Sequence, residues 1–512
     1  MDKLYTKYSA DTSTRLSAGE ILRLIRTKSS DFWSRERERR PLKLFHSAAE
    51  RVPAYKDFLK KHKIRHEKIR TFKDFQLVPP VSKKNYLRQY PLEKLCWDGT
   101  LKKPLVFTST SGSTGEPFYF PRGERLDWEY SILAEMFLGN SSYKSKGPKL
   151  VIVGLGMGAW IGGLITYKAF EIGSLRRKHE VSIITPGINK FEILHALKKL
   201  SPHYAETILI GYPPFVKDML DEAVDEGIDL KKLNMRLLSA AEAYTEKFRD
   251  YIIKKASVKN IYLDVLNIYG TADIGAMAWE TPTSILIRRL AVKDEKIFNE
   301  IFSPIQKTPT LAQYNPLFIT FESVENEILL TGNNTIPLVR YAVGDHGGAF
   351  SYSDAVSKLS KHEIELKKEA KKNRISHAIY ELPFVYVYER HDFSTKLYGA
   401  IIYPEPVREA LHDDKLNRFV TGRFTMLTKF DKKQNQFLEI HVELKKKSRS
   451  TNSLKKICQD LIIENLIRKN AEYRNNYSSV PQKVTPRIIF WRYEHPLHFK
   501  TGIKQKWVKK DE

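Results

Sequence analysis

The stretch Thr108-Ser109-Thr110-Ser111-Gly112-Ser113-Thr114-Gly115-Glu116-Pro117 carries six Ser or Thr hydroxyl groups and two glycines before Glu116. Glycine lets the backbone turn successive N–H groups toward one point, and hydroxyl groups add donors that rotate to meet an oxyanion. The stretch therefore predicts a phosphate-binding loop. It is not the mononucleotide loop GxxxxGK[ST], because no Lys-Ser or Lys-Thr follows Gly115. Taken alone, it also fits a flexible Ser/Thr/Gly linker.

The sequence around this loop has an α/β pattern. Before it, apolar and charged positions at helical spacing predict helices at 18–26, 44–49 and 56–61. After it, to about residue 386, strand-like apolar runs alternate with amphipathic runs. Strands are expected at 150–153, 180–184, 207–210 and 326–330, and helices at 191–200 and 215–226. This alternation predicts a large α/β domain with mixed sheets.

The pattern changes near Tyr388, which divides the expected domains into 1–388 and 389–512. The second domain is predicted to be a small α+β unit on a hinge. Its expected strands cover 436–444 and 487–493, and its helix covers 454–468. Two additions to the large domain are expected, a charged and irregular stretch at 287–317 and a Lys/Glu-rich amphipathic helix at 354–374.

Composition narrows the function classes for these 512 residues. The net charge of +26 comes from basic residues that are mixed with acidic ones, which is typical of a solvated surface and does not favour nucleic-acid binding. The start has no apolar signal region, and the only two cysteines are Cys96 and Cys458, so we expect a cytoplasmic protein. The uncharged run 150–167 is interrupted by five glycines, so a strand and a turn are expected rather than a membrane span.

Three further motifs follow the loop. They are Tyr269-Gly270-Thr271-Ala272-Asp273, Arg340-Tyr341-Ala342-Val343-Gly344-Asp345 and Arg390-His391-Asp392. Each one alone is most often a turn that ends a strand. Upstream of the loop stands Pro79-Pro80-Val81-Ser82-Lys83-Lys84-Asn85-Tyr86-Leu87.

In this order the motifs resemble those of the adenylate-forming enzymes, the acyl-CoA synthetase-like superfamily. The upstream segment and the form YGTAD resemble its phenylacetate–CoA ligase and CapK-type branch, and the resemblance covers roughly residues 75–508. It implies an ATP-dependent and Mg²⁺-dependent ligase. A small carboxylic acid would become an acyl-adenylate, and a thiol, usually that of coenzyme A, would then displace AMP.

The resemblance also implies residue roles. The loop residues that would cradle the β- and γ-phosphates are Ser111, Gly112, Ser113, Thr114 and Gly115. The adenine would lie against Tyr269, within the segment Tyr269-Gly270-Thr271, and against the backbone of Ala241 and Glu242. Asp345 would bind the ribose hydroxyls, and Arg390 the ribose or a phosphate. Asp273 would ligate Mg²⁺.

Two implied roles concern the small domain. Asp392 matches the hinge about which this domain rotates. The catalytic lysine, which bridges the carboxylate and the α-phosphate, is placed at Lys504, with Lys500 as the alternative. The expected acyl pocket is lined by 154–163 and 210–214, where Trp160 and Tyr212 suggest an apolar or aromatic acid.

Three positions depart from the family pattern. Glu116 stands where Lys is common, Ala272 lacks a hydroxyl, and Phe393 replaces a second hinge aspartate. Two alternatives therefore stay open. The acyl group could pass to an amine, a sugar or a carrier protein, or the fold could serve a non-catalytic binding protein. The resemblance allows a homodimer, and the sequence leaves the acid and the oligomeric state undecided.

Overall fold

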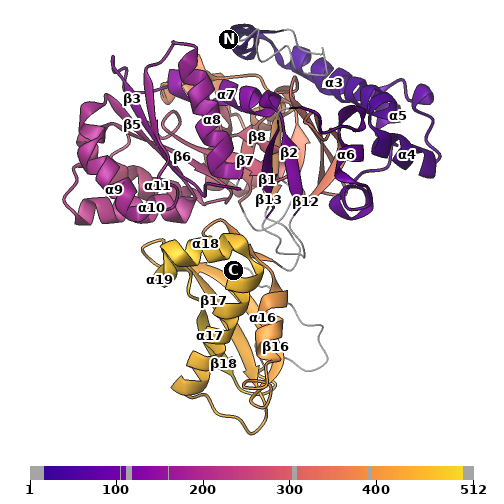
Figure 1. Ribbon diagram of the computed structural model, residues 1–512. Helices are drawn as coiled ribbons and strands as arrows, with labels where there is room; N and C mark the ends of the chain where they lie inside the picture. The colour runs from indigo at the N-terminus through magenta and orange to yellow at the C-terminus, as the bar shows by residue number, and fades with distance from the viewer. Residues whose placement is uncertain are drawn as a thin grey trace.

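The computed structural model describes residues 16–103, 105–110, 118–159, 161–302, 308–388, 394–496 and 498–499. A large part with an extensive sheet lies above a smaller part formed by the C-terminal residues (Figure 1). The expected fold class, a large α/β domain followed by a small α+β domain, is confirmed.

Within the described chain, residues 18–99 are mainly helical, as expected. Ser17, Thr71 and Ser82 each precede a helix and form a capping box. The side chain of each accepts a hydrogen bond from the backbone amide three residues later, and the side chain of that later residue accepts one from the backbone amide of the cap residue. The elements are α2 (Ala18–Thr27), α3 (Ser30–Arg51), α4 (Pro53–Lys61), η1 (His66–Lys68), α5 (Phe72–Phe75), η2 (Lys83–Leu87), α6 (Leu92–Leu95) and η3 (Trp97–Gly99).

An eleven-stranded mixed sheet forms the centre of the large part. Its order is β10-β11-β12-β13-β9-β8-β7-β6-β5-β3-β4. The strands are β3 (Lys149–Gly154), β4 (Val181–Ile184), β5 (Glu206–Gly211), β6 (Met235–Ala240), β7 (Val265–Thr271), β8 (Gly275–Trp279), β9 (Thr310–Gln313), β10 (Ile319–Val324), β11 (Glu327–Gly332), β12 (Leu338–Phe350) and β13 (Phe384–Tyr388). The strands from β4 to β7 pair in parallel, and the others pair antiparallel.

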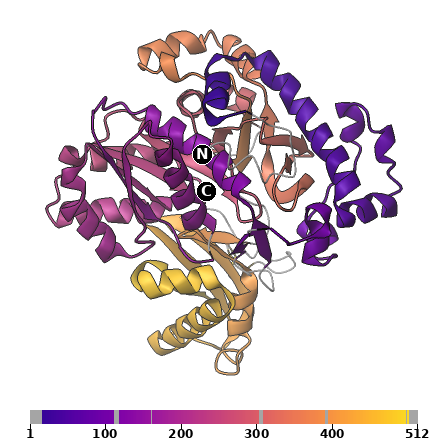
Figure 2. The ribbon, with the colours of Figure 1, turned by 45° about the horizontal axis from the view of Figure 1, so that its top comes forward.

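Helices cover both faces of the parallel half, so its strands are continuous apolar runs. In β3, Val151 and Val153 pack in a core with α7 and α8, whereas Leu150 and Ile152 pack in another with α9 and α10. Figure 2 shows the same layers from a second direction. The helices are α7 (Glu124–Gly139), α8 (Ile161–Leu175), α9 (Lys190–Lys199), α10 (Pro213–Asp225) and α11 (Glu246–Ala256), with single turns η4 (Ser201–His203) and η5 (Leu230–Leu233).

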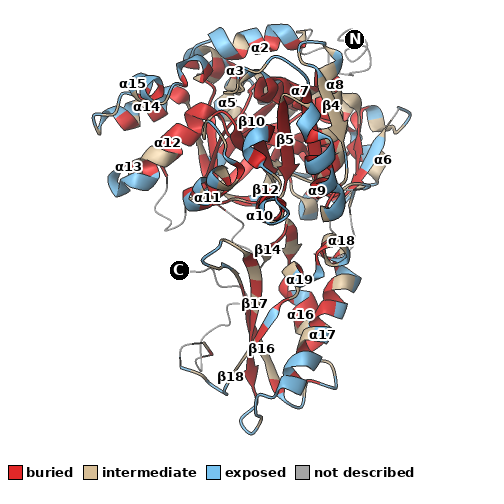
Figure 3. Ribbon diagram, turned by 90° about the vertical axis from the view of Figure 1, so that its left-hand side faces the viewer, coloured by how far each residue is buried: buried red, intermediate tan, exposed pale blue. Residues whose placement is uncertain are grey.

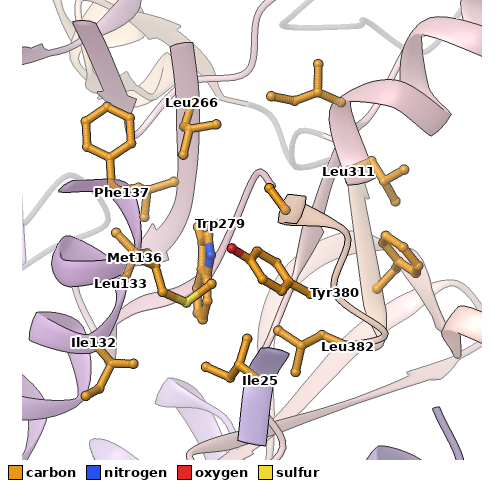
Figure 4. Packing of buried hydrophobic residues seen from close by; sticks show 14 of the residues in the cluster. Ile25, Ile132, Leu133, Met136, Phe137, Leu266, Trp279, Leu311, Tyr380 and Leu382 are labelled. Carbon is orange, nitrogen blue, oxygen red and sulfur yellow. The ribbon is translucent and has the colours of Figure 1, made fainter. Parts of the chain in front are cut away.

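The first core joins the two halves of the sheet. Trp279 at the end of β8 lies between Met136 of α7 and the ring of Tyr380 (Figure 4). The antiparallel half packs its other face on α3 and α4 in a third core. This third core contains Ile274 of the β7–β8 turn together with Tyr341 and Val343 of β12, and so it packs the two segments together.

Two expectations for the additions are wrong. Residues 287–301 are helical rather than irregular, because Pro282 starts α12 (Pro282–Lys293) at its first turn and α13 (Glu295–Ile301) follows at once. The stretch 354–374 is not one helix. It divides into α14 (Tyr352–Ser360) and α15 (Leu366–Lys372), with Glu363 between them in a left-handed conformation at φ 60°; η6 (Ser376–Ala378) follows.

The small part has its own three-stranded sheet, in the order β16-β17-β18, and a separate hairpin. Figure 3 shows its helices gathered on one side of that sheet. The elements are β14 (Thr395–Leu397), β15 (Ala400–Ile402), α16 (Pro404–Leu411), β16 (Val420–Phe430), β17 (Gln436–Leu444), α17 (Asn452–Lys469), α18 (Ala471–Ser479), α19 (Pro481–Val484) and β18 (Arg487–Trp491). The predicted strands and helix of this unit are confirmed.

The two parts share no sheet among the described strands, but they touch. The core beneath α9 and α10 continues into the small part through residues such as Tyr398. The run 150–167 divides into β3, a turn and α8, and no helix of the described ranges could cross a membrane.

Candidate active site

The motifs meet at the carboxyl ends of the parallel strands, where open α/β sheets bind their ligands. The strands β5, β6 and β7 run directly into Tyr212, Ala241 and the Thr271–Asp273 turn. β3 ends at Gly154, where the glycine-rich segment begins. The sheet therefore places four predicted segments at one edge.

The Ser/Thr/Gly loop joins the two strands of a hairpin, β1 (Val106–Ser109) and β2 (Tyr119–Arg122). Arg122 anchors this hairpin, because its guanidinium donates to the Thr108 hydroxyl and to the carbonyl oxygen of Ala272. The Ser109 amide donates to the carbonyl oxygen of Ala159 at 3.0 Å. Both ends of the loop are thus held beside the Ala272–Asp273 turn and the glycine-rich segment.

Asp273 is a buried carboxylate with two partners. Lys83 Nζ lies 2.8 Å from Oδ1, and the Tyr341 hydroxyl donates to Oδ2 at 2.7 Å. Asp273 is 2% exposed, whereas the Lys83 side chain is 34% exposed. Val81 pairs with Tyr341, and this bridge brings the upstream segment to the first half of β12.

Tyr269 and Asp345 lie in direct contact. The Tyr269 hydroxyl donates to Asp345 Oδ2 at 2.6 Å, which joins the end of β7 to the middle of β12. Gly344 precedes Asp345 with φ +81°, a conformation that favours glycine. Asp345 is 8% exposed. The two residues that the resemblance assigns to adenine and ribose are therefore neighbours.

Gly270 and Thr271 shape the turn between these carboxylates. A Cβ atom on Gly270 would lie 2.7 Å from the carbonyl oxygen of Gly275, so this position has no room for a side chain. The Thr271 hydroxyl accepts a hydrogen bond from the Asp273 amide at 3.3 Å. The turn thereby orients Asp273 toward Lys83.

Ala241 and Glu242 connect the site to the small part. Ala241 has φ 74°, and its carbonyl oxygen accepts a hydrogen bond from Lys396 Nζ at 2.6 Å. The Glu242 carboxylate accepts from the Gly399 amide and from Gln436 Nε2, the latter at 2.9 Å. The Glu242 side chain thus contacts the small part, at the segment to which the resemblance assigns the adenine.

Several predicted positions lie outside the described residues. They are Ser111, Gly112, Ser113, Thr114, Gly115, Trp160, Arg390, Asp392, Lys500 and Lys504. In the described ranges, no group of three or more His, Cys, Asp or Glu side chains is arranged to hold a metal ion.

Sequence reasoning missed two cations of the site. Lys83 belongs to the quoted upstream segment but received no role. Arg122 follows the loop by a few residues, and its buried Nη1 atom has no hydrogen-bond partner within the described chain. Burial lowers the pKa of Arg122, while Asp273 and Asp127 raise it. Burial in turn raises the pKa of Asp127 to about 6, against the lowering effect of Arg122.

Arg122 also bears on the departure at Glu116. The loop lacks the lysine that is common there, and Arg122 supplies a positive charge at the base of the same loop. Arg122 is the last residue of β2, a few residues after the loop, and this closeness in the sequence was the one local signal for its role.

Comparison with known proteins identifies the fold. No protein-family model and no curated protein matches the sequence. Among solved structures, the chain is similar to 2-hydroxyisobutyryl-CoA ligase in complex with 2-HIB-AMP and CoA in the thioesterification state, with 15% identity, coverage of 99% of this chain and 94% of that chain, and a TM-score of 0.60. The chain has the fold of the adenylate-forming CoA ligases.

The same ligase in other states is less similar. Its postadenylation state with 2-HIB-AMP gives 14% identity, coverage of 98% and 93%, and a TM-score of 0.51. An open conformation gives 14% identity, coverage of 98% of both chains and a TM-score of 0.50. All three structures are of one ligase, and the TM-score of this chain is higher with the thioesterification state than with the other two.

Proposed function

We propose that this protein activates a small carboxylic acid with ATP and transfers the acyl group to a thiol, that of coenzyme A. The observation that carries the proposal is the joined arrangement of Tyr269 with Asp345 and of Lys83 with Asp273. Both pairs lie at the carboxyl edge of the sheet, in a fold that CoA ligases share. We further infer that the chain is of the phenylacetate–CoA ligase and CapK-type branch, on its upstream segment and YGTAD motif.

The chain's own residues would act by positioning and by charge. The acid's carboxylate attacks the α-phosphate of ATP, and pyrophosphate leaves. Lys83 and Arg122 place positive charge beside the loop and the Asp273 turn, where negative charge develops during this step. The loop 111–115 would hold the β- and γ-phosphates, and Asp345 the ribose.

A Mg²⁺ ion fits this donor set in part. Asp273 offers the oxygen ligand that a hard cation prefers, and it already faces one cation, Lys83. Asp273 would hold the ion together with ATP oxygens and water. When bound, Mg²⁺ neutralises charge on the phosphates.

The small part would carry the second set of roles. We propose domains at 1–388 and 389–512, a hinge that includes Asp392, an Arg390 contact to the nucleotide, and Lys504 as the lysine of the adenylation step. Rotation about such a hinge would present a different face of the small part to the active site in each of the two half-reactions. The two free cysteines, Cys96 and Cys458, are buried and accord with a cytoplasmic location.

The test is acid-dependent pyrophosphate release. The panel contains phenylacetate, benzoate, 2-hydroxyisobutyrate, hexanoate and decanoate, each with ATP and Mg²⁺, with and without CoA. At least one acid is expected to give pyrophosphate, and its acyl-CoA is expected when CoA is present. Acid-dependent pyrophosphate with no acyl-CoA would instead support transfer to an amine, sugar or carrier protein. No release with any acid would support a non-catalytic binding protein.

A further inference from the structure

Glu472 lies at the end of the small part that faces the large sheet. It is the second residue of α18, which the views of Figures 1 and 3 both place next to the large part. Asn470 caps this helix and also donates through Nδ2 to the carbonyl oxygen of Ile401 at 2.8 Å. Asn476, one turn further, donates to the carbonyl oxygen of Tyr398 at 2.8 Å. The position of Glu472 is therefore set by two contacts with the β14–β15 hairpin.

The Glu472 carboxylate is enclosed and only partly satisfied. The Ile401 amide donates to it. Its Oε2 atom is buried and has no hydrogen-bond partner among the described residues. A buried carboxylate oxygen without a partner is costly, so its retention calls for a ligand or a reaction.

The groups around Glu472 belong to the active site. Lys396 and Lys83 are close enough to lower its pKa, and the Glu472 charge acts on the hydroxyl of Tyr212, as does that of Glu242. Lys83 is bound to Asp273, and Lys396 to the carbonyl oxygen of Ala241. Tyr212 follows β5 directly, at the expected acyl pocket. The Glu472 carboxylate therefore lies near three residues of the candidate site, Lys83, Lys396 and Tyr212.

The titration of Glu472 suits proton transfer. Burial raises its pKa to about 7, against the lowering effects of the Ile401 amide, Lys396 and Lys83. A carboxyl group in this range gives up and accepts protons readily near neutral pH.

We propose that the Glu472 carboxylate is the general base that takes the proton of the attacking thiol. The inference rests on the proposed function. The thiol S–H bond gives its proton to Oε2, and the sulfur electron pair forms the C–S bond to the acyl carbon. The C–O bond to the phosphate breaks, and AMP leaves with that electron pair. The products are a thioester, AMP and protonated Glu472, which then loses its proton to solvent.

The arrangement of the parts assigns this role to the second step. Glu472 is supplied by the small part, and the chain has a TM-score of 0.60 with the thioesterification state of the similar ligase against 0.51 with its postadenylation state. A rotation of the small part for adenylation would carry Glu472 away from the site. Its removal should therefore spare adenylation.

The experiment compares E472Q with wild type and with E464Q, in which an exposed glutamate of the neighbouring α17 is changed. Gln keeps the shape of the side chain and an acceptor for the Ile401 amide but cannot take a proton. ATP–pyrophosphate exchange is measured with the best acid of the panel, and transfer to CoA is measured in single turnover from the enzyme-bound acyl-adenylate. Exchange should be unchanged, and transfer at pH 7 should fall on the order of 100-fold or more in E472Q alone.

The pH profile separates a base from a structural residue. In E472Q the deficit should shrink as the pH rises from 7 to 9.5, because the thiol then ionises without help. A deficit that is equal at all pH values, a loss of exchange, or wild-type transfer overturns the inference. If E472Q unfolds at a lower temperature than wild type, E472D decides instead, since it should retain a slower but base-dependent transfer.

Failure of the underlying function gives a different result. Wild-type protein that shows no acid-dependent exchange overturns the ligase proposal and with it the role of Glu472. Wild-type exchange and transfer that E472Q leaves intact overturn only the role of Glu472.

Discussion

Asp273 and Asp345 lie in one site with different partners. Asp273 faces the ammonium group of Lys83 at 2.8 Å, whereas Asp345 accepts from the neutral hydroxyl of Tyr269 at 2.6 Å. An ammonium compensates the charge of a buried carboxylate, whereas the Tyr269 hydroxyl satisfies Asp345 as a hydrogen-bond acceptor. Asp273 therefore suits a site of cations and phosphates, and Asp345 suits neutral hydroxyl groups.

The Asp345→Ala variant should bind ATP much more weakly. It would lose two hydrogen bonds from the ribose hydroxyls to a charged acceptor, each worth about 1.5–3 kcal/mol. Isothermal titration of ATP measures the change, with the exposed Asp31→Ala on α3 as the control. Unchanged ATP affinity in Asp345→Ala would count against the whole assignment of the site.

The Lys83→Met variant should slow adenylation at least tenfold and lower stability by about 1–2 kcal/mol. Met preserves much of the aliphatic stem, but Asp273 would stay buried without its cation. The stability figure is discounted because the Lys83 side chain is one-third exposed. Pyrophosphate exchange and thermal unfolding measure the two effects. The neighbouring exposed Lys84→Met should show neither, and equal behaviour of both variants would remove Lys83 from the site.

At the scale of elements, two hairpins present loops to the site. The β1–β2 hairpin carries the Ser/Thr/Gly loop and is held by Arg122. The β14–β15 hairpin turns at Gly399, which has φ +82° and meets the ring of Tyr212, so that a Cβ there would lie 2.7 Å from ring atoms. The second hairpin comes from the small part, so its contact depends on the arrangement of the two parts.

The Gly399→Ala variant should impair transfer to the thiol far more than adenylation. The added methyl group would push the hairpin off Tyr212 in the arrangement seen here, but would meet no such barrier once the small part has rotated. Gly422→Ala in β16 is the matched control, since Gly422 has the same φ and the atoms nearest to a Cβ there belong to the His412 ring. Single-turnover rates of the two half-reactions measure the effect. An equal loss in both half-reactions would show that Gly399 matters only for folding.

At the scale of the whole molecule, polar contacts hold the two parts together. Asp218 of α10 accepts from the Tyr398 hydroxyl and pairs with Lys483 at 2.9 Å. Lys217 donates to Asn435 at 2.6 Å, and Glu242 accepts from Gly399 and Gln436. Because these contacts are directional hydrogen bonds around an apolar contact, they favour one arrangement, and water would replace them in the rotation of the small part that we propose.

The Asp218→Asn variant should loosen the small part. The substitution removes the charge that Lys483 pairs with and weakens the acceptor for Tyr398, two contacts of about 1 kcal/mol or more each. Small-angle scattering should report a larger radius of gyration, and hydrogen exchange should rise in β14 and β15. Asp225→Asn, an exposed position at the end of the same helix, should change neither. If both variants scatter like wild type, the interface is held by its apolar contacts alone.

Local patterns of the sequence predicted most elements because their causes are local. The strand at 436–444 and the helices near 191–200 and 215–226 follow from the spacing of apolar residues within each segment. The error at 287–301 has a local cause as well. The charged residues and the prolines at 304 and 309 indicated an irregular chain. Those two prolines come after α13 has ended, however, and Pro282 stands in the first turn of α12, where proline is compatible with a helix.

The sequence by itself determined the fold class and the order of the motifs, because each motif is a short run whose residue types and spacing are read directly. The roles proposed for Tyr269, Asp273 and Asp345 come from the family resemblance that these motifs carry. The tertiary structure alone decided the positions of Lys83, Arg122 and Glu472 beside those motifs. Their contacts join segments far apart in the chain, through the Val81–Tyr341 bridge, the β1–β2 hairpin and the meeting of α18 with the large part. The neighbours of a charged residue in the sequence do not reveal which distant residue it will contact when buried. That partner is set only by the packing of the sheet and of the two parts.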